Sequence, residues 1–320
     1  MRRPVRRGVV IAGLLAAGGL TVAVAAPTEV NGPASATKLA KRTVGATLAG
    51  CPIYPADNAW NQAIDRLPIR AGVRIPSGSL HPDFGEFAGY GIPYVVVPAG
   101  QPLVPITYTD YGDESDPGPF PIPLDAPVEG GGQSGDRHVI ALQQGTCQLF
   151  ELFVGRRSGN GWLAASGAKF DLTSNALRPL GWTSADAAGL PILPGLVKFE
   201  EVAAGRINHA IRVTFGDTRR GYILPATHFA SDDNDPGLAA MGQRFRMRAG
   251  YDISGLTGQA RVIAEALKVY GFIVADNGSN WFFQGAPSPG WDDDDLNQLK
   301  RIPGSAFEAV DTGPVLTTSS

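Results

Sequence analysis

The feature that most limits the possible folds of this chain is the distribution of glycine and proline. The 320 residues include 41 glycines and 26 prolines, which are spread between short apolar runs instead of being collected in one block. Because both residues interrupt helices, this spacing is typical of proteins built from many short strands and long loops. The sequence therefore predicts a mostly β protein with a β-sandwich or jelly-roll-like body and long Pro/Gly loops.

Short runs rich in β-branched and aromatic residues predict the strands. They are residues 94–97, 103–108, 138–142, 147–154, 162–165, 169–172, 207–215, 221–224, 272–275 and 281–283. Two turns predict hairpins, at residues 143–146 and at residues 276–279, where an Asn-Gly step tolerates positive φ. One substantial helix is expected over residues 258–270, which are apolar at helical spacing, and a short one over residues 292–300.

The N-terminal residues have the three parts of a secretory signal peptide. Four arginines among the first seven residues precede an uncharged run over residues 9–26, which ends in the small-x-small pattern Ala23-Val24-Ala25. We expect a signal peptide over residues 1–25, a flexible linker over residues 26–50, and one β-rich domain or two β subdomains over residues 51–320. The arginine pairs leave open whether the general or the twin-arginine export route is used.

The charge balance argues against two classes of partner. The chain has 27 basic and 30 acidic residues, and loss of the four N-terminal arginines leaves 23 basic residues and a net charge of −7. Binding to a phosphate backbone needs a basic face, and so does binding to an anionic membrane surface. We therefore expect neither a nucleic-acid partner nor, after signal cleavage, a membrane.

Two cysteines allow two interpretations. In an exported protein, Cys51 and Cys147 are expected to form a disulfide. Alternatively, residues 48–51 (Leu-Ala-Gly-Cys) spell a lipobox, in which Cys51 would be lipidated and anchor a cell-surface lipoprotein. Charged residues between positions 38 and 42 separate this motif from the apolar run, so the disulfide and a secreted, extracellular protein are favoured.

Two histidines are the first candidates for catalysis. Side chains alternate along a strand, so His209 points to the same side as its apolar neighbours. A hairpin register that pairs Leu142 with Cys147 would place His138 directly opposite Glu151. A histidine and a carboxylate on an apolar face are typical of a general acid/base pair, because burial moves their pKa values towards neutrality. The alternative is a structural ion pair and a core histidine.

Five further residues are candidates for the same site. Asp171, at the end of a predicted strand, is either a second catalytic carboxylate or a residue that stabilises a turn. Arg137 could neutralise an acidic sugar, and Asn208 lies beside the inward histidine. Trp182 and Trp281 are either platforms on which sugars stack or part of the core.

No cofactor is expected, although calcium remains an alternative. Two acidic loops, residues 110–116 and 232–235, offer the oxygen ligands that calcium prefers, but neither has EF-hand spacing. The G-x-S-x-G, H-E-x-x-H and P-loop motifs do not occur.

Several long blocks resemble a family of secreted bacterial and fungal proteins to which no activity is assigned. They are GWTSADAAGLPILPGLVKFEEVAAGRINHAIRVTF (residues 181–215), DYGDESDPGPFPIP (110–123), GDRHVI (135–140) and VADNGSNWFFQGAPSPGWDDDDL (274–296). The resemblance covers nearly all of residues 51–312. It implies a single domain and assigns no catalytic residue.

These observations favour a secreted carbohydrate-active enzyme that acts on an extracellular polysaccharide or oligosaccharide. In a glycoside hydrolase, Glu151 and Asp171 would act as the acid and the base or nucleophile. In a polysaccharide lyase, His209 or His138 would remove a proton while Arg137 neutralises a uronate. The alternatives are a non-catalytic glycan-binding or cell-surface module, and another secreted hydrolase with a metal held by His138, His209 and Glu151.

Overall fold

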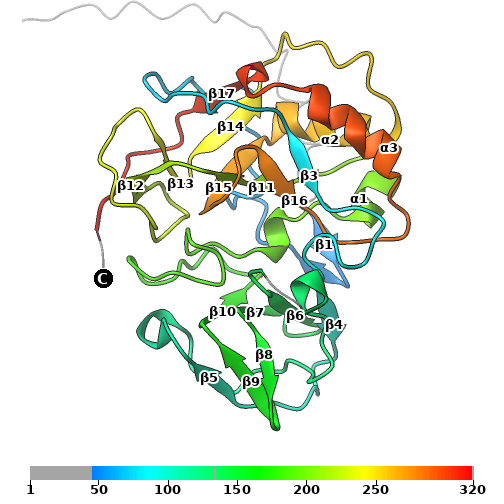
Figure 1. Cartoon of the computed structure of the whole chain (residues 1–320), viewed down its shortest axis with the longest axis vertical. Helices are drawn as coiled ribbons and strands as arrows, with labels where there is room; N and C mark the ends of the chain where they lie inside the picture. Colours follow the sequence, from blue (N-terminus) through cyan, green and yellow to red (C-terminus); the bar gives the residue numbers. More distant parts are fainter. Residues whose placement is uncertain (1–44, 133–134, 319–320) are drawn as a thin grey trace, which may run out of the picture. The chain divides into compact units, whose positions relative to one another are not determined.

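A computed structural model describes residues 45–132 and 135–318 (Figure 1). Residues 43–320 form one compact unit. The predicted signal peptide and most of the predicted linker lie outside the described residues. The described part is mostly β, with several sheets and one substantial helix, as the sequence predicts. It contains no helix that is both long enough and apolar enough to cross a membrane.

The larger sheet has six strands in the order β17-β14-β15-β11-β16-β3. Their bounds are β3 (His81–Asp83), β11 (Ile211–Phe215), β14 (Arg244–Met247), β15 (Phe272–Asn277), β16 (Phe282–Gln284) and β17 (Phe307–Val310). The central strands β11 and β15 are parallel and almost wholly buried. Helix α2 (Gly258–Val269) packs against β14 through a buried stripe in which residues recur at helical spacing. That stripe consists of Ala260, Ile263, Ala264, Ala266 and Leu267.

The second sheet has four strands in the order β10-β7-β6-β4, and it is covered on both faces. The strands are β4 (Val95–Val97), β6 (Val139–Gln143), β7 (Gln148–Phe153) and β10 (Ser166–Asp171). Ile140 and Leu149 face the main core, whereas Val139 and Leu152 belong to a smaller core with Trp162. That smaller core lies against a three-stranded sheet of β5 (Ile106–Tyr108), β8 (Arg156–Ser158) and β9 (Gly161–Ala164).

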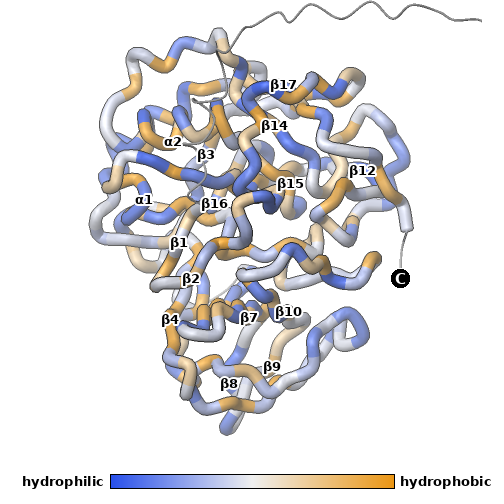
Figure 2. The backbone as a smooth tube through the Cα atoms, turned by 180° about the vertical axis from the view of Figure 1, so that it is seen from behind, coloured by the Kyte–Doolittle hydropathy of each residue, from blue (hydrophilic) through white to orange (hydrophobic). Residues whose placement is uncertain are grey.

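The remaining elements are short. They are β1 (Thr47–Leu48), β2 (Cys51–Pro52), β12 (Thr218–Tyr222), β13 (Ala239–Met241), α1 (Phe199–Ala203) and α3 (Asp293–Leu296), with 3₁₀ turns η1 (Gly112–Glu114), η2 (Glu129–Gly132), η3 (Leu193–Gly195), η4 (Asn297–Arg301) and η5 (Gly304–Ala306). Short hydrophobic stretches alternate with hydrophilic ones throughout, as the glycine and proline spacing suggests (Figure 2). Because β1 pairs with β2 and Ala46 is buried, residues 45–50 of the predicted linker are folded.

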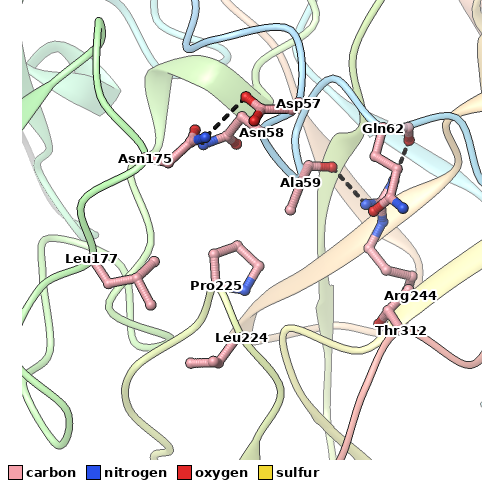
Figure 3. A pocket seen from close by; sticks show the side chains of 10 residues that line it. All are labelled: Asp57, Asn58, Ala59, Gln62, Asn175, Leu177, Leu224, Pro225, Arg244 and Thr312. Atoms are coloured by element: carbon pink, nitrogen blue, oxygen red, sulfur yellow. Dashed lines mark hydrogen bonds between the residues drawn. The ribbon is translucent and has the colours of Figure 1, made fainter.

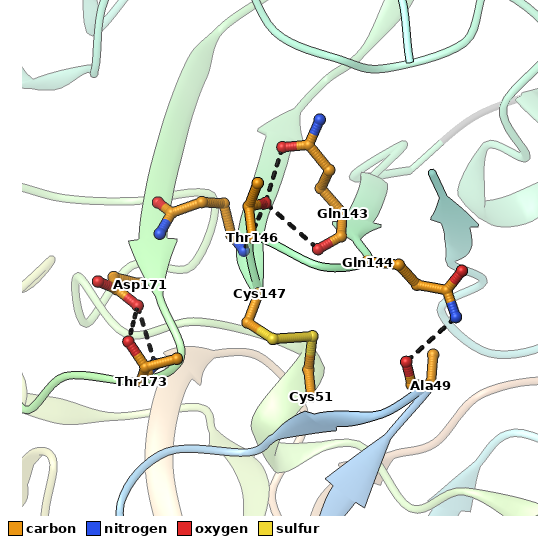
Figure 4. Close-up of a disulfide and its surroundings, with 9 residues drawn as sticks. Ala49, Cys51, Gln143, Gln144, Thr146, Cys147, Asp171 and Thr173 are labelled. Atoms are coloured by element: carbon orange, nitrogen blue, oxygen red, sulfur yellow. Dashed lines mark hydrogen bonds between the residues drawn. A yellow bond between two sulfur atoms is a disulfide. The ribbon is translucent and has the colours of Figure 1, made fainter. Parts of the chain in front are cut away.

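The predicted disulfide between Cys51 and Cys147 is present (Figure 4). It joins β2 to the turn between β6 and β7, and its two Cα atoms lie 5.4 Å apart. Such bonds persist in oxidising compartments, which fits an exported protein.

The predicted hairpin over residues 272–283 is wrong. Strand β15 continues through Asp276 and Asn277, and β11 lies between β15 and β16. Gly278 donates its N–H to Phe215 O at the end of β11. The fully buried β11 needs a hydrogen-bonded partner on each edge, and the two flanking strands supply them.

The predicted register of the β6–β7 hairpin is also wrong. Leu142 pairs with Leu149, and Ile140, not His138, lies opposite Glu151. The turn is longer than expected because Cys147 adopts φ of 53° and donates its N–H to Gln143 O. Each residue of β6 is therefore paired two residues later on β7 than expected.

Candidate active site

A pocket of about 190 Å³ opens between the smaller sheets and the end of β15. Its walls are rich in hydroxyl groups, and it contains two carboxyl groups and one imidazole. The lining residues are Tyr111, Phe153, Ser166, Thr183, Ser184, Ala185, Asp186, Ala187, His228, Ala230 and Asp276.

Asp276 is the carboxyl group of the pocket with a pKa raised well above that of a surface aspartate. A bulge in the β11–β15 ladder follows Val213, so that Thr214 pairs with Asp276. Burial, and then the negative charge of Asp186, raises the pKa of Asp276 to about 7. One of its oxygens accepts the N–H of Asn277 at 2.7 Å. Near neutral pH the group can therefore donate a proton.

Asp186 is held differently. Its two oxygens accept hydrogen bonds from Nε and Nη2 of Arg212, at 3.0 and 2.5 Å. The remaining Nη1 of Arg212 donates to Gln284 Oε1 at 2.6 Å. Both charged side chains are almost completely buried. This bidentate pair holds Asp186 as an anion beside Asp276, and it leaves the Asp186 carboxylate little freedom to react.

His138 supports the loop that forms the pocket wall. Its Nδ1 lies 2.7 Å from Glu129 Oε2, and its Nε2 lies 3.0 Å from Ala185 O. Because both partners are acceptors, both ring nitrogens must donate, which makes the ring an imidazolium. Burial favours the neutral ring, but Glu129 outweighs it and raises the pKa of His138 to about 9.

His228 has a defined tautomer. Its Nδ1 lies 2.7 Å from Ala187 O, a carbonyl that can only accept, so Nδ1 carries the proton. In the neutral ring, Nε2 then has a free lone pair. Glu114 Oε2 lies 4.0 Å from this atom. The ring is partly exposed and stacks on Phe229, with 5.9 Å between ring centroids.

Backbone contacts fix the loop of residues 183–189 against β15. Ala188 donates its N–H to Ala275 O, and the N–H of Thr227 donates to Ala188 O. Gly189 adopts φ of +71°, and a Cβ there would lie 2.1 Å from Thr227 Oγ1. Only glycine fits this close approach, which keeps the wall of the pocket and the His228 loop together.

The structure separates the sequence-predicted catalytic residues. Glu151 is fully buried, and its carboxylate accepts the N–H groups of Ile192 and Leu193, so it anchors that turn. The predicted His138–Glu151 cross-strand pair is absent, since His138 bonds to Glu129 instead.

His209 and Asp171 lie outside the pocket. His209 points inward as predicted, is fully buried, and contacts Glu201 at 3.0 Å and Lys198 at 3.4 Å. Burial opposes ionisation of Glu201, yet Lys198 and His209 lower its pKa to about 2. Asp171 accepts hydrogen bonds from the N–H and hydroxyl of Thr173, which is the turn-stabilising role.

The predicted substrate-binding residues are not gathered around the pocket. Arg137 donates to backbone carbonyls of Gly132 and Gly155. Trp281 is fully buried and donates to Pro76 O, so it is a core residue and not a sugar platform. Trp182 is partly exposed, with Arg178 stacked over its ring at 5.7 Å. Asn208 is also partly exposed.

Neither acidic loop gathers ligands for a metal. Among the described residues, no group of three or more His, Cys, Asp or Glu side chains could hold a metal ion. Asp116 pairs with Arg178, and Asp235 with Arg74. The three-residue metal set of His138, His209 and Glu151 is not assembled either, because each residue bonds to different partners.

Sequence reasoning missed Asp276, Asp186 and His228 as site residues. Asp276 stood in an apparent hairpin turn, and no strand or helix was predicted at Asp186. A usable signal was present, because Asp276 directly follows the apolar run of residues 272–275 and so lies at the end of a buried strand. Comparison of the chain with family models, with curated proteins and with solved structures finds no match.

Proposed function

We propose that the pocket is the active site of a glycan-cleaving enzyme in which Asp276 is the general acid. The observation that carries the proposal is a carboxyl group with a pKa of about 7, placed in the wall of a pocket. Cleavage of a glycosidic bond requires a proton on the leaving oxygen, and a carboxylic acid that stays protonated near neutral pH supplies it.

His228 completes the proposed chemistry as the general base. Asp276 gives its proton to the glycosidic oxygen as the bond to the anomeric carbon breaks. Nε2 of His228 accepts a proton from water, whose oxygen bonds to that carbon. Transfer of this proton through solvent back to Asp276 restores both groups. Since Arg212 occupies both oxygens of Asp186, a water attack is favoured over a carboxylate nucleophile.

The lining and the size of the pocket support a sugar as the substrate. Tyr111 is an exposed aromatic residue at the pocket, and sugars stack on such rings. The hydroxyls of Ser166, Thr183 and Ser184, in contrast, already donate to backbone carbonyls. A volume of about 190 Å³ suits one sugar ring better than a larger ligand. A non-catalytic sugar-binding module gains less support, because Trp60, Trp162, Trp281 and Trp291 are all buried.

The test is a screen of the purified protein on a panel of neutral and acidic polysaccharides. Reducing ends report hydrolysis, and ultraviolet absorbance of an unsaturated product reports a lyase. On the active substrate, Asp276→Asn should lower turnover by roughly 10²-fold or more, because the amide cannot donate the proton. His228→Gln should also lower turnover, because the amide cannot accept the proton from water.

A matched control is Asp171→Asn, which makes the same change in a carboxylate outside the pocket and should keep turnover within about threefold. Circular dichroism verifies folding of each variant. Equal turnover of Asp276→Asn and wild type on a cleaved substrate would reject Asp276 as the acid. Binding of glycans without cleavage of any would favour the binding module.

A further inference from the structure

A second pocket, of about 300 Å³, lies on another part of the molecule (Figure 3). Arg244 of β14 forms one side, and Leu177, Leu224 and Pro225 form the other. The polar residues Asp57, Asn58, Gln62, Asn175 and Thr312 complete the lining with Ala59. Leu177 and Leu224 are 46% and 45% exposed, so the pocket is open to solvent on that side.

Arg244 is a buried charge without a counter-charge. Only 2% of the residue is exposed, and its guanidinium donates to three backbone carbonyls, those of Ala59, Gln62 and Tyr270. Among the described residues, no carboxylate lies within ion-pair distance of it. The three other buried arginines, Arg178, Arg212 and Arg246, each have a carboxylate partner. Burial alone lowers the pKa of Arg244, and the group remains protonated at neutral pH.

Two donors in this pocket lack partners within the described part of the chain. They are Nε of Arg244 and the hydroxyl Oγ1 of Thr312, and both atoms are buried. Buried polar groups are nearly always hydrogen-bonded, so two orphan donors on residues that line one pocket favour a missing acceptor at this place. The carboxylate in the lining, Asp57, accepts a hydrogen bond from Asn175 and forms none with Arg244, whose guanidinium partners are the three carbonyls.

We propose that this pocket binds an oxyanion, with Arg244 supplying the positive charge and Thr312 a hydrogen-bond donor. A carboxylate on a sugar and an inorganic phosphate share this chemistry. In either case the anion neutralises a buried charge that the protein leaves unpaired. A charge-assisted hydrogen bond is strongest at such a site, because little water competes for the guanidinium. The proposal goes beyond the Asp276 chemistry and does not depend on it, since its test measures binding alone.

The experiment is calorimetric titration of the full mature protein with three probes at constant ionic strength. The probes are sodium glucuronate, neutral glucose as its uncharged counterpart, and inorganic phosphate. We expect glucuronate or phosphate to bind and to raise the melting temperature, while glucose does neither, since a ligand stabilises the state that it binds. Binding of glucuronate identifies an acidic sugar as the ligand class, and binding of phosphate alone identifies a phosphate.

Variants locate the binding. Leu177→Trp fills the open side of the pocket without altering Arg244, and it should weaken anion binding at least tenfold. Leu180→Trp is the matched control, because Leu180 is 47% exposed and does not line the pocket. Thr312→Val should weaken binding several-fold by removing one donor. Arg244→Gln should abolish it, and the two leucine variants keep the test decisive even where Arg244→Gln does not fold.

Two results would overturn the proposal. One is the absence of binding by both glucuronate and phosphate. The other is equal anion affinity of wild type and Leu177→Trp, because the anion would then bind elsewhere on the protein.

Discussion

The surroundings of Glu151 and of Asp276 make an informative comparison. Glu151 is fully buried and Asp276 is partly exposed, yet desolvation is the largest cause of a pKa raised to about 7 in both. Glu151 lies in a closed interior, where two backbone N–H groups satisfy its oxygens. Asp276 lines an open pocket and neighbours an anion held by arginine.

The comparison shows that a perturbed pKa does not by itself identify a catalytic residue. Structural and catalytic carboxyl groups have the same titration behaviour when desolvation dominates both. What differs is access. A proton donor must reach a substrate. The Glu151 carboxylate accepts two backbone N–H groups in a closed core, so it cannot contact one.

The largest expected difference between Asp276 and Glu151 is in the pH dependence of activity, which should follow the titration of Asp276 alone. If Asp276 is the general acid, turnover per enzyme should fall about tenfold for each pH unit above a value near 7, because the protonated fraction falls in that proportion. The measurement is kcat/KM on the substrate found by the glycan screen, between pH 5 and 9. A profile that stays flat up to pH 9 would show that a different group donates the proton.

A second expectation concerns Glu151. Replacement by Gln keeps the size but places an amide N–H against a backbone N–H, so we expect a loss of about 1–3 kcal/mol in the free energy of unfolding. Activity should remain within about threefold of wild type. Denaturant unfolding and the same kinetic assay measure the two effects. A hundredfold loss of turnover in a fully folded variant would contradict the structural role of Glu151.

The smallest expected effect is on stability at Asp276. Its folded-state pKa lies above the ordinary value of 3.8, so its contribution to stability is present below pH 3.8 and is lost as pH rises through about 7. Asp276→Asn removes this penalty and should stabilise the protein at pH 8 by on the order of 1 kcal/mol, below the roughly 4 kcal/mol of full linkage, because solvent screens the partly exposed side chain. Thermal unfolding at pH 8 and at pH 5 gives the comparison, and a gain that is no larger at pH 8 would argue against a raised pKa.

Local pattern was sufficient to predict many elements of this fold, but not β3, β14 and β17, which are three strands of the larger sheet. The helix over residues 258–270 and the strands at 94–97, 147–154 and 272–275 agree closely with α2, β4, β7 and β15. Each is specified by side chains a few positions apart. The disulfide could be predicted as well, because an exported chain with two cysteines has one intramolecular pairing.

Register and strand order could not be predicted, for physical reasons. The β6–β7 register depends on the positive φ of Cys147, a conformation that propensity does not suggest for cysteine. The separation of β15 from β16 depends on β11, a strand more than 50 residues away in the sequence. Long-range pairing of this kind is decided by burial in the complete fold.

The candidate site failed to emerge from the sequence for the same reason. His138 and His209 are buried as predicted, although each lies just before its strand and not within it. Their carboxylate partners, Glu129 and Glu201, come from a 3₁₀ turn and a short helix. The pocket itself draws residues from positions between 111 and 276. The burial of single side chains could be predicted from the sequence, whereas the convergence of several loops on one pocket could not.

The bond between Cys51 and Cys147 also bears on resistance to proteolysis. It spans 96 residues, and that interval contains Phe87, which is 72% exposed in a loop. Exposed loops are where proteases cut first. A single cut there would leave two polypeptides that stay linked through sulfur and remain packed in the same sheets. Under non-reducing electrophoresis the nicked protein would migrate as one species, and only a reductant would release the N-terminal piece.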